Sequence, residues 1–121
     1  MNVLLVEDEP LIQKSLKKLM EKRGATVDAV SSGKEAITHI LNNDYDRIVC
    51  DLMLQDTTGF DVIEESKKKF SREDIARKFV VITAYTSAQV HDKAATYGCR
   101  VIGKPFEDLE AALKIFTTKG E

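Results

Sequence analysis

The sequence predicts an α/β fold, in which a five-stranded parallel sheet of strand order 2-1-3-4-5 is doubly wound, with helices on both faces. Apolar runs of roughly four to six residues alternate with amphipathic segments of roughly ten to fifteen, which is the pattern of repeated βα units. Five such units, (βα)5, fit the 121 residues. Right-handed crossovers between parallel strands then place helices on both faces of the sheet.

The first unit is predicted to be an apolar strand at residues 3–6 and a helix that begins at Pro10 and ends at Gly24. Proline suits the first helical position because its φ is fixed and its missing N–H is not needed there, and glycine commonly follows a helix. The apolar residues at helical spacing in this segment should face the core: Ile12, Leu16, Leu19 and Met20.

The second unit is predicted to have a short strand near residues 26–30 and a helix that begins after Ser32. Ser32 and Glu35 have the spacing of a capping box. The third strand, at residues 47–50, leads directly to Asp51. The residues that the second helix should bury are Ala36, Ile37, Ile40 and Leu41.

The later elements follow the same alternation. The helix after the turn at residues 56–59 should bury Phe60 and Ile63, whereas the polar stretch 70–78 gives no clear boundaries. The remaining elements are a strand at 79–82, a helix at about 87–97 ended by Gly98, a short strand near 101–102, and a final helix that buries Leu109, Ala112, Leu113 and Phe116. The complete arrangement is a flavodoxin-like topology.

Length and charge restrict the class of protein. A chain of 121 residues has the size of one domain, which we expect to span residues 1–121. The formal net charge of -2 disfavours direct nucleic-acid binding. The start MNVLLVEDE has no basic segment followed by a long apolar stretch, so we expect a cytoplasmic protein without membrane insertion. Cys50 and Cys99 show neither metal-ligand spacing nor a pairing pattern, which is typical of reduced thiols.

Functional side chains stand just past four of the apolar runs. Glu7 and Asp8 follow the first run, Asp51 follows the third, Thr83 the fourth and Lys104 the fifth. The carboxyl ends of parallel strands meet at one edge of a sheet, so these five side chains should gather where open α/β sheets bind ligands.

The chemistry of this set favours phosphoryl transfer. Three carboxylates this close raise one another's pKa unless a cation lies among them, and Mg²⁺ suits a site with few carboxylates that also recruits phosphate oxygens. Asp51 could act as a nucleophile that forms an acyl phosphate. The cation and Lys104 would neutralise the phosphoryl oxygens, and Thr83 would donate a hydrogen bond to one of them.

Each residue taken alone also has a structural interpretation. Glu7 and Asp8 could cap the first helix, where acidic side chains complement the helix dipole. Thr83 is an ordinary residue for a strand end, and Lys104 before a proline is common in loops. The functional interpretation depends on joint placement, because four separate strand ends carry complementary groups.

With these residues assembled, the chain resembles the response-regulator receiver domain of two-component signalling, including chemotaxis response regulators, over essentially its whole length. The matching segments are VLLVEDEP, DLMLQDTTGFDV, VVITA and GKPF. The resemblance implies that Asp51 is the phosphoacceptor and that Glu7, Asp8, Asp51 and the backbone carbonyl of Met53 bind Mg²⁺. It also implies that Thr83, Ala84 and Lys104 bind the phosphoryl group and take part in switching, and that the bond before Pro105 is a candidate cis peptide.

The same resemblance implies partners and activity. A histidine kinase or a histidine phosphotransfer protein would supply the phosphoryl group, and a downstream protein effector would recognise the phosphorylated form. The chain would not be a conventional enzyme, although it would accept phosphoryl groups weakly from small donors and hydrolyse its own acyl phosphate. His39 and His91 are expected in helices away from the site edge and not as phosphodonors.

Three positions depart from the family pattern. Gln55 replaces the usual proline, although Gly59 is retained, and residues 98–104 are one residue shorter than usual. Val101 occupies the position of the usual switch aromatic. We therefore expect switching to rely on the loop after Thr83, with Tyr85 or Tyr97 as substitute rings. Met53 and Tyr85 should flank the path of attacking water and slow hydrolysis.

Two rival classes share parts of this pattern. A Mg²⁺-dependent phosphatase or mutase of the haloacid dehalogenase type also uses an aspartate after a strand, but it needs a second aspartate where this chain has Met53. A flavodoxin-like cofactor binder needs a phosphate loop rich in Gly, Ser or Thr after the first strand, whereas this chain has the acidic sequence VEDEP there.

Overall fold

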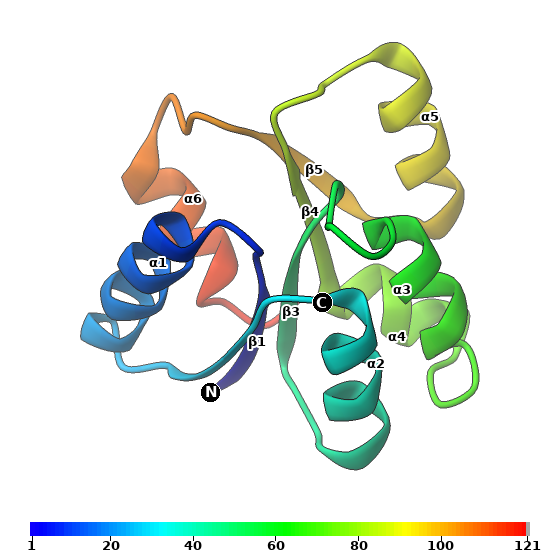
Figure 1. Cartoon of the computed structure of the whole chain (residues 1–121), viewed down its shortest axis with the longest axis horizontal. Helices are drawn as coiled ribbons and strands as arrows, with labels where there is room; N and C mark the ends of the chain where they lie inside the picture. Colours follow the sequence, from blue (N-terminus) through cyan, green and yellow to red (C-terminus); the bar gives the residue numbers. More distant parts are fainter. Residues whose placement is uncertain (121) are drawn as a thin grey trace.

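The computed structural model describes residues 1–120 and contains one five-stranded sheet between two layers of helices (Figure 1). All neighbouring strands are parallel, and their order is β2-β1-β3-β4-β5, which confirms the predicted topology. The strands are β1 (Asn2–Val6), β2 (Thr26–Val30), β3 (Arg47–Asp51), β4 (Phe79–Thr83) and β5 (Arg100–Gly103). The helices are α1 (Pro10–Lys22), α2 (Gly33–Asn42), α3 (Gly59–Ser66), α4 (Arg72–Lys78), α5 (Ala88–Tyr97) and α6 (Leu109–Phe116).

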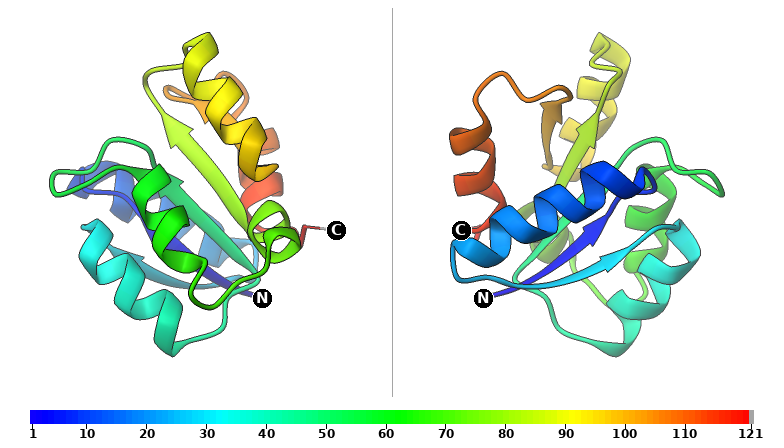
Figure 2. Two further views of the ribbon diagram at one scale, coloured as in Figure 1. Left: turned by 90° about the vertical axis from the view of Figure 1, so that its right-hand side faces the viewer. Right: turned by 60° about the vertical axis from the view of Figure 1, so that its left-hand side comes forward.

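Two hydrophobic cores lie on opposite faces of the sheet. Leu4 and Val6 of β1 belong to the core under α2, α3, α4 and α5, whereas Val3 and Leu5 belong to the core under α1 and α6. This alternation follows from the period of two in a strand, and it explains why the central strands are apolar on both faces. The two helical layers are visible in the side views of Figure 2.

The helix starts agree with local capping chemistry. Pro10 is the first residue of α1, and the carboxylate of Glu9 accepts hydrogen bonds from the N–H groups of Leu11 and Ile12. The helix ends at Lys22, just before Gly24, whose φ of 92° lies in the left-handed region that glycine adopts without steric cost. Ser32 caps α2 by accepting from the N–H of Glu35, as its spacing predicted.

Two predicted core residues are exposed. Leu41 and Leu109 each expose 40% of their surface. Both lie in a terminal turn of their helix, α2 and α6 respectively, where fewer residues of the sheet and of neighbouring helices can cover a side chain. The other apolar positions predicted to face the core in these two helices are buried or half-buried: Ala36, Ile37, Ile40, Ala112, Leu113 and Phe116.

Helix α4 was not predicted, although its start has a clear sequence signal. Ser71 accepts a hydrogen bond from the N–H of Asp74, whose carboxylate accepts one from the N–H of Ser71, so the two residues form a capping box. Ile75 is the one fully buried residue of this short helix. A single apolar contact gives no helical stripe in the sequence, which is why the polar stretch 70–78 gave no boundaries.

Cys50 and Cys99 are both free and buried, with 0% and 9% of their surface exposed. Burial raises the pKa of the Cys99 thiol to about 12, and burial together with the nearby charge of Asp51 raises the pKa of Cys50 further. Both thiols are therefore protonated at neutral pH. Within residues 1–120, no helix is both long enough and apolar enough to cross a membrane.

Candidate functional site

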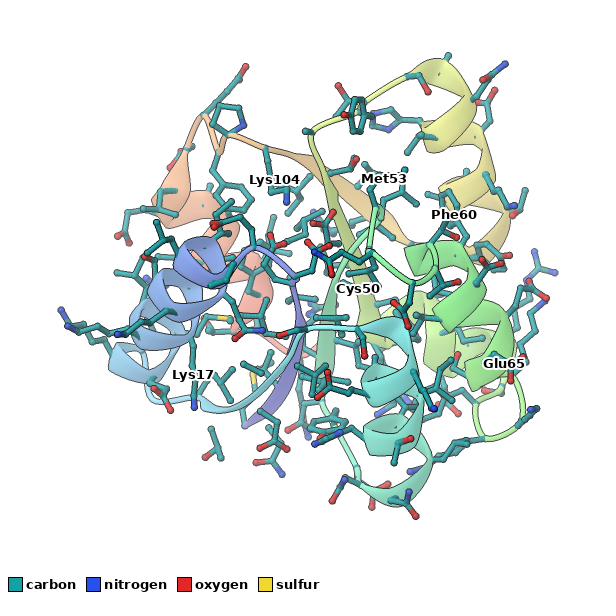
Figure 3. The ribbon with its side chains drawn as sticks, in the orientation of Figure 1. Lys17, Cys50, Met53, Phe60, Glu65 and Lys104 are labelled. Atoms are coloured by element: carbon teal, nitrogen blue, oxygen red, sulfur yellow. The ribbon has the colours of Figure 1, made fainter. Side chains whose placement is uncertain are left out.

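The predicted site residues lie together at the carboxyl edge of the sheet. Asp51 is the last residue of the central strand β3, and Thr83 is the last residue of β4. Glu7 follows β1 directly, and its N–H donates to the carbonyl of Val30 on β2. Lys104 follows β5, and Figure 3 shows it with Met53 at this edge. The parallel register thus brings four strand ends to one place.

Three carboxylates form an acidic cluster at this edge. One oxygen from each of Glu7, Asp8 and Asp51 lies within 4.8 Å of the others. Glu7 is fully buried and Asp51 is 4% exposed, whereas Asp8 is half-buried. Neither Glu7 nor Asp8 accepts the first N–H groups of α1, because Glu9 does so. The structural interpretation of the acidic pair as helix caps is therefore wrong.

Lys104 connects the two most buried carboxylates. Its Nζ donates to Glu7 Oε1 and to Asp51 Oδ2, each over 2.8 Å. Burial and, to a smaller extent, the neighbouring Asp51 raise the pKa of Glu7 to about 7, although Lys104 opposes both effects. Burial alone would lower the pKa of Lys104, but its bonds to Asp51 and Glu7 outweigh burial and keep the pKa above its usual value.

Backbone and side-chain hydrogen bonds fix the residues around the cluster. The N–H of Lys104 donates to the carbonyl of Thr83 over 2.8 Å, which extends the pairing of β4 with β5, and the Lys104–Pro105 peptide bond is cis. The side-chain amide of Gln13 donates to the carbonyls of Glu7 and Val30 over 2.8 and 2.9 Å. No sequence pattern marks Gln13, because its role depends on where α1 lies over the strand ends.

The loop between β3 and α3 is a tight turn beside Asp51. The N–H of Met53 donates to Asp51 Oδ1 over 3.3 Å, and Met53 pairs with Thr58 across the turn. The backbone bonds that close the turn are accepted by the carbonyls of Leu52 and Thr57, not by that of Met53. A Cβ on Gly59 would lie 2.8 Å from the carbonyl oxygen of Asp51, so only glycine fits against this strand end.

The segment after β4 is held by a side-chain hydroxyl. Thr83 is fully buried, and its Oγ1 accepts a hydrogen bond from the N–H of Tyr85 over 2.9 Å. Ala84 is exposed, and the Tyr85 side chain is 66% exposed. Tyr97 points elsewhere, because its ring stacks on Phe60 of α3 with a centroid separation of 6.0 Å. Of these two tyrosines, it is thus Tyr85 that has a hydrogen bond to a site residue, through its backbone N–H.

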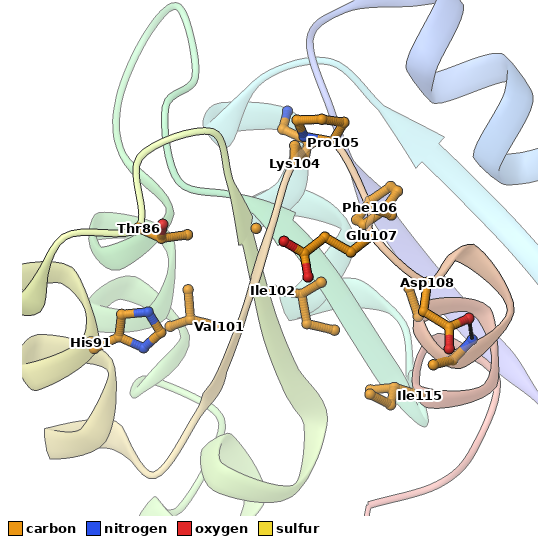
Figure 4. A pocket seen from close by; sticks show the side chains of 13 residues that line it. Thr86, His91, Val101, Ile102, Lys104, Pro105, Phe106, Glu107, Asp108 and Ile115 are labelled. Atoms are coloured by element: carbon orange, nitrogen blue, oxygen red, sulfur yellow. Dashed lines mark hydrogen bonds between the residues drawn. The ribbon is translucent and has the colours of Figure 1, made fainter.

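Val101 lines a cavity of about 620 Å³ beside β5 (Figure 4). Thr86, His91 and Val101 lie on one side of the strand, and Phe106 and Asp108 lie on the other. The short Val101 side chain therefore borders open space. His91 lies on α5 by this cavity and His39 lies on α2, so neither histidine belongs to the acidic cluster.

The donor atoms of the cluster suit a hard divalent cation. All three side chains offer carboxylate oxygens, the Met53 carbonyl is free of the bonds that close its turn, and no sulfur or imidazole ligand takes part. The raised pKa of Glu7 also indicates that Lys104 alone does not compensate the cluster. The residues therefore fit a Mg²⁺- or Ca²⁺-like ion.

The fold and the site together define a phosphoacceptor class of α/β signalling domain, with an acidic pocket at the end of the central strand. The chain belongs to the response regulator receiver domain family, whose model matches residues 3–115. The family match and the curated relatives give no support to the haloacid dehalogenase alternative.

The relatives agree with this assignment. The response regulator SaeR of Staphylococcus aureus is 36% identical over 117 residues, which cover 94% of this chain and 48% of SaeR. The non-phosphorylated HemR receiver domain of Leptospira biflexa is 30% identical with a TM-score of 0.85, covering 99% of this chain and 97% of that one. A Burkholderia pseudomallei response regulator with a phosphorylated aspartic acid, a calcium ion and citrate is 25% identical with a TM-score of 0.81, covering 97% and 66%. This chain thus spans about half the length of SaeR.

Proposed function

We propose that Asp51 accepts a phosphoryl group from the phosphohistidine of a histidine kinase or a histidine phosphotransfer protein, with Mg²⁺ as the cofactor. The observation that carries this proposal is the position of Asp51, buried at the end of the central strand with Oδ2 bonded to Lys104 and two further carboxylates beside it. The phosphorylated aspartic acid in the Burkholderia pseudomallei regulator supports the same role for a receiver aspartate.

In the transfer, a carboxylate oxygen of Asp51 attacks the phosphorus, and the bond from phosphorus to the donor nitrogen breaks. The electron pair of that bond stays on the imidazole of the donor, so atoms and charge balance. Lys104 already lies 2.8 Å from Asp51, and its ammonium would bind an oxygen of the incoming phosphoryl group. The hydroxyl hydrogen of Thr83 would donate to a second oxygen.

Mg²⁺ would be held by Glu7, Asp8, Asp51 and the Met53 carbonyl, and it would supply positive charge that stabilises the developing charge on the phosphoryl oxygens. Mg²⁺ is favoured over Ca²⁺ because Mg²⁺ binds through few carboxylates and keeps several waters, whereas Ca²⁺ takes six to eight oxygen ligands. With Asp8 half-buried, solvent can reach one side of the cluster.

Phosphorylation would change the surface that a downstream protein effector binds, through the segment after Thr83. We propose that residues 1–121 act as a single receiver domain, with weak phosphorylation from small donors and slow self-dephosphorylation in place of turnover.

Intact mass spectrometry after incubation with acetyl phosphate and Mg²⁺ tests this proposal. Wild type should gain the mass of one phosphoryl group, and chelation of Mg²⁺ should abolish the gain. Asp51→Asn should gain none, because an amide is a poor nucleophile at this position. An adduct of equal yield in wild type and Asp51→Asn would show that Asp51 is not the acceptor.

A further inference from the structure

Asp56 links the loop that follows Asp51 to a different helix. Its Oδ1 accepts a hydrogen bond from the N–H of Gly33 over 2.9 Å, and its Oδ2 accepts one from the N–H of Lys34 over 3.1 Å. Gly33 and Lys34 are the first two residues of α2 and lie 22 to 23 positions earlier in the sequence. Both carboxylate oxygens thus bridge the β3–α3 loop to α2.

The link completes the start of α2. An α-helix leaves its first N–H groups without intrahelical partners, and Ser32 accepts only that of Glu35. Asp56 supplies acceptors for the two N–H groups that precede that of Glu35, namely those of Gly33 and Lys34. These backbone bonds lower the pKa of Asp56, with the bond from Gly33 contributing most. The carboxylate is therefore charged at neutral pH, where it also complements the helix dipole.

Close packing reinforces the link. A Cβ on Gly33 would lie 2.1 Å from Cγ2 of Thr57 and 3.3 Å from Cγ2 of Val62. Such a contact forces Thr57 or the backbone of Gly33 to shift, so a larger residue at position 33 would disturb the place where the loop meets the helix. Thr57 also donates from its hydroxyl to Asp61 Oδ2 over 2.8 Å, which connects the loop to the first turn of α3.

The segment that needs this support carries the Met53 carbonyl. Only Pro10 and Pro105 are present in the chain, so no proline restricts the backbone between Asp51 and Gly59. Within the turn, the N–H of Leu54 donates to the carbonyl of Thr57 over 3.1 Å. Because this bond ties Leu54 to Thr57, holding residues 56 and 57 in place also restrains the backbone next to Met53.

We propose that Asp56 is a positioning residue for the cation site, because its carboxylate fixes the β3–α3 loop to the start of α2 and so holds the Met53 carbonyl where it can act as a ligand. This inference rests on the proposed function for the identity of the cation. Asp56 itself binds neither the cation nor the phosphoryl group. It acts through the loop backbone.

The affinity for Mg²⁺, measured by calorimetric titration of the unphosphorylated protein, tests this role. Asp56→Ala should weaken binding by about 5- to 10-fold, near the lower end of the effects of residues that orient ligands. Asp74→Ala is the matched control, because it also removes a carboxylate that caps a helix, α4, whose capping box is not part of the site. Both variants should lose stability, but the control should keep the wild-type affinity.

A second pair of variants separates positioning from loss of charge. Gly33→Ala keeps Asp56 but places a Cβ against Thr57, so it should weaken Mg²⁺ binding as Asp56→Ala does. Adding Thr57→Ser removes the obstructing Cγ2 while it keeps the hydroxyl, and it should restore most of the affinity. Amide exchange at residues 33 and 34 should rise in Asp56→Ala without Mg²⁺, because both N–H groups lose their acceptor.

The outcomes distinguish this inference from the proposed function. Wild-type affinity in Asp56→Ala, or an equal loss in Asp74→Ala, would overturn the positioning role even if Asp51 is phosphorylated normally. Failure of acetyl phosphate to modify wild type, with Mg²⁺ binding still dependent on Asp56, would overturn the acceptor role alone. A wild-type protein that binds no Mg²⁺ would overturn both.

Discussion

The ammonium of Lys104 lies 2.8 Å from Asp51 Oδ2 and equally close to a carboxylate oxygen of Glu7. One lysine ammonium from the end of β5 thus binds two buried carboxylates at the ends of other strands. In the resting protein, these buried carboxylates therefore need a positive charge beside them.

Replacing Lys104 with alanine should destabilise the metal-free protein. Removing one partner of a buried ion pair leaves an uncompensated charge, and here two carboxylates would lose their partner, so we expect a loss of about 3 kcal/mol or more. Urea unfolding at pH 7.5 with EDTA measures the loss. Lys119→Ala, which removes only a partly exposed pair with Asp46, should cost no more than about 1 kcal/mol. Equal losses in the two variants would contradict the prediction.

The stability of the metal-free protein should fall as the pH rises from about 4.5 to about 7. Burial raises the pKa of Glu7 from 4.5 in the unfolded chain to about 7, so the folded state keeps a proton that the unfolded state releases in this window. The stabilisation is complete below the unfolded pKa and is lost as the pH passes the folded pKa. At about 1.4 kcal/mol per unit, the change is up to about 3 kcal/mol.

Subtracting the unfolding free energy of Glu7→Gln at each pH isolates this effect. The other carboxylates with altered pKa values, among them Asp46 and Asp56, have lowered values and titrate at more acidic pH. A difference between wild type and Glu7→Gln that does not change between pH 4.5 and 7.5 would show that Glu7 does not hold this proton.

The segment from Thr83 to Tyr85 should move when Asp51 is phosphorylated. Thr83 Oγ1 accepts the N–H of Tyr85 in the resting protein, and reorientation of the hydroxyl toward a phosphoryl oxygen would disturb that bond. Amide NMR shifts at residues 83–86 should change on addition of beryllofluoride and Mg²⁺. Thr83→Ala should lose most of this change while it still binds Mg²⁺. An unmoved segment in wild type would argue against switching through this loop.

Alanine at Met53 or Tyr85 should shorten the lifetime of the acyl phosphate. Their side chains are 51% and 66% exposed beside the loops that border Asp51, so they can hinder the approach of water. We expect hydrolysis to accelerate by up to about 10-fold, which corresponds to about 1.4 kcal/mol of barrier. Loss of phosphoprotein after removal of the donor measures the half-life. Leu11→Ala, in the first turn of α1 and 75% exposed, is the control and should leave it unchanged.

The strands could be predicted because each depends on local sequence, and their order followed from the crossover rules for parallel βα units. Continuous apolar runs indicate strands buried on both faces, and Pro10 and Ser32 mark helix starts whatever the tertiary context. The gathering of Glu7, Asp51 and Lys104 followed from parallel topology alone. Features that arise between distant segments could not be predicted in this way.

The Asp56 link and the Gln13 amide illustrate this limit. Asp56 meets residues 22 to 23 positions earlier, and Gln13 reaches a carbonyl 17 positions later, at Val30. Neither spacing follows a helical or strand period, so no sequence pattern marks either of these two contacts. Helix α4 is a different case, because the Ser71 and Asp74 signal was present in the sequence but lacked an apolar stripe to support it.

The concealment of both sulfhydryl groups has a practical consequence for spectroscopy. Cys50 and Cys99 are buried and protonated, so thiol-reactive dyes and nitroxides should not modify the native chain at neutral pH. A single cysteine introduced by Thr86→Cys, at an exposed position just beyond Tyr85, would therefore be labelled selectively in the otherwise native sequence. Fluorescence or electron paramagnetic resonance from that one site would then follow the segment after Thr83 in real time.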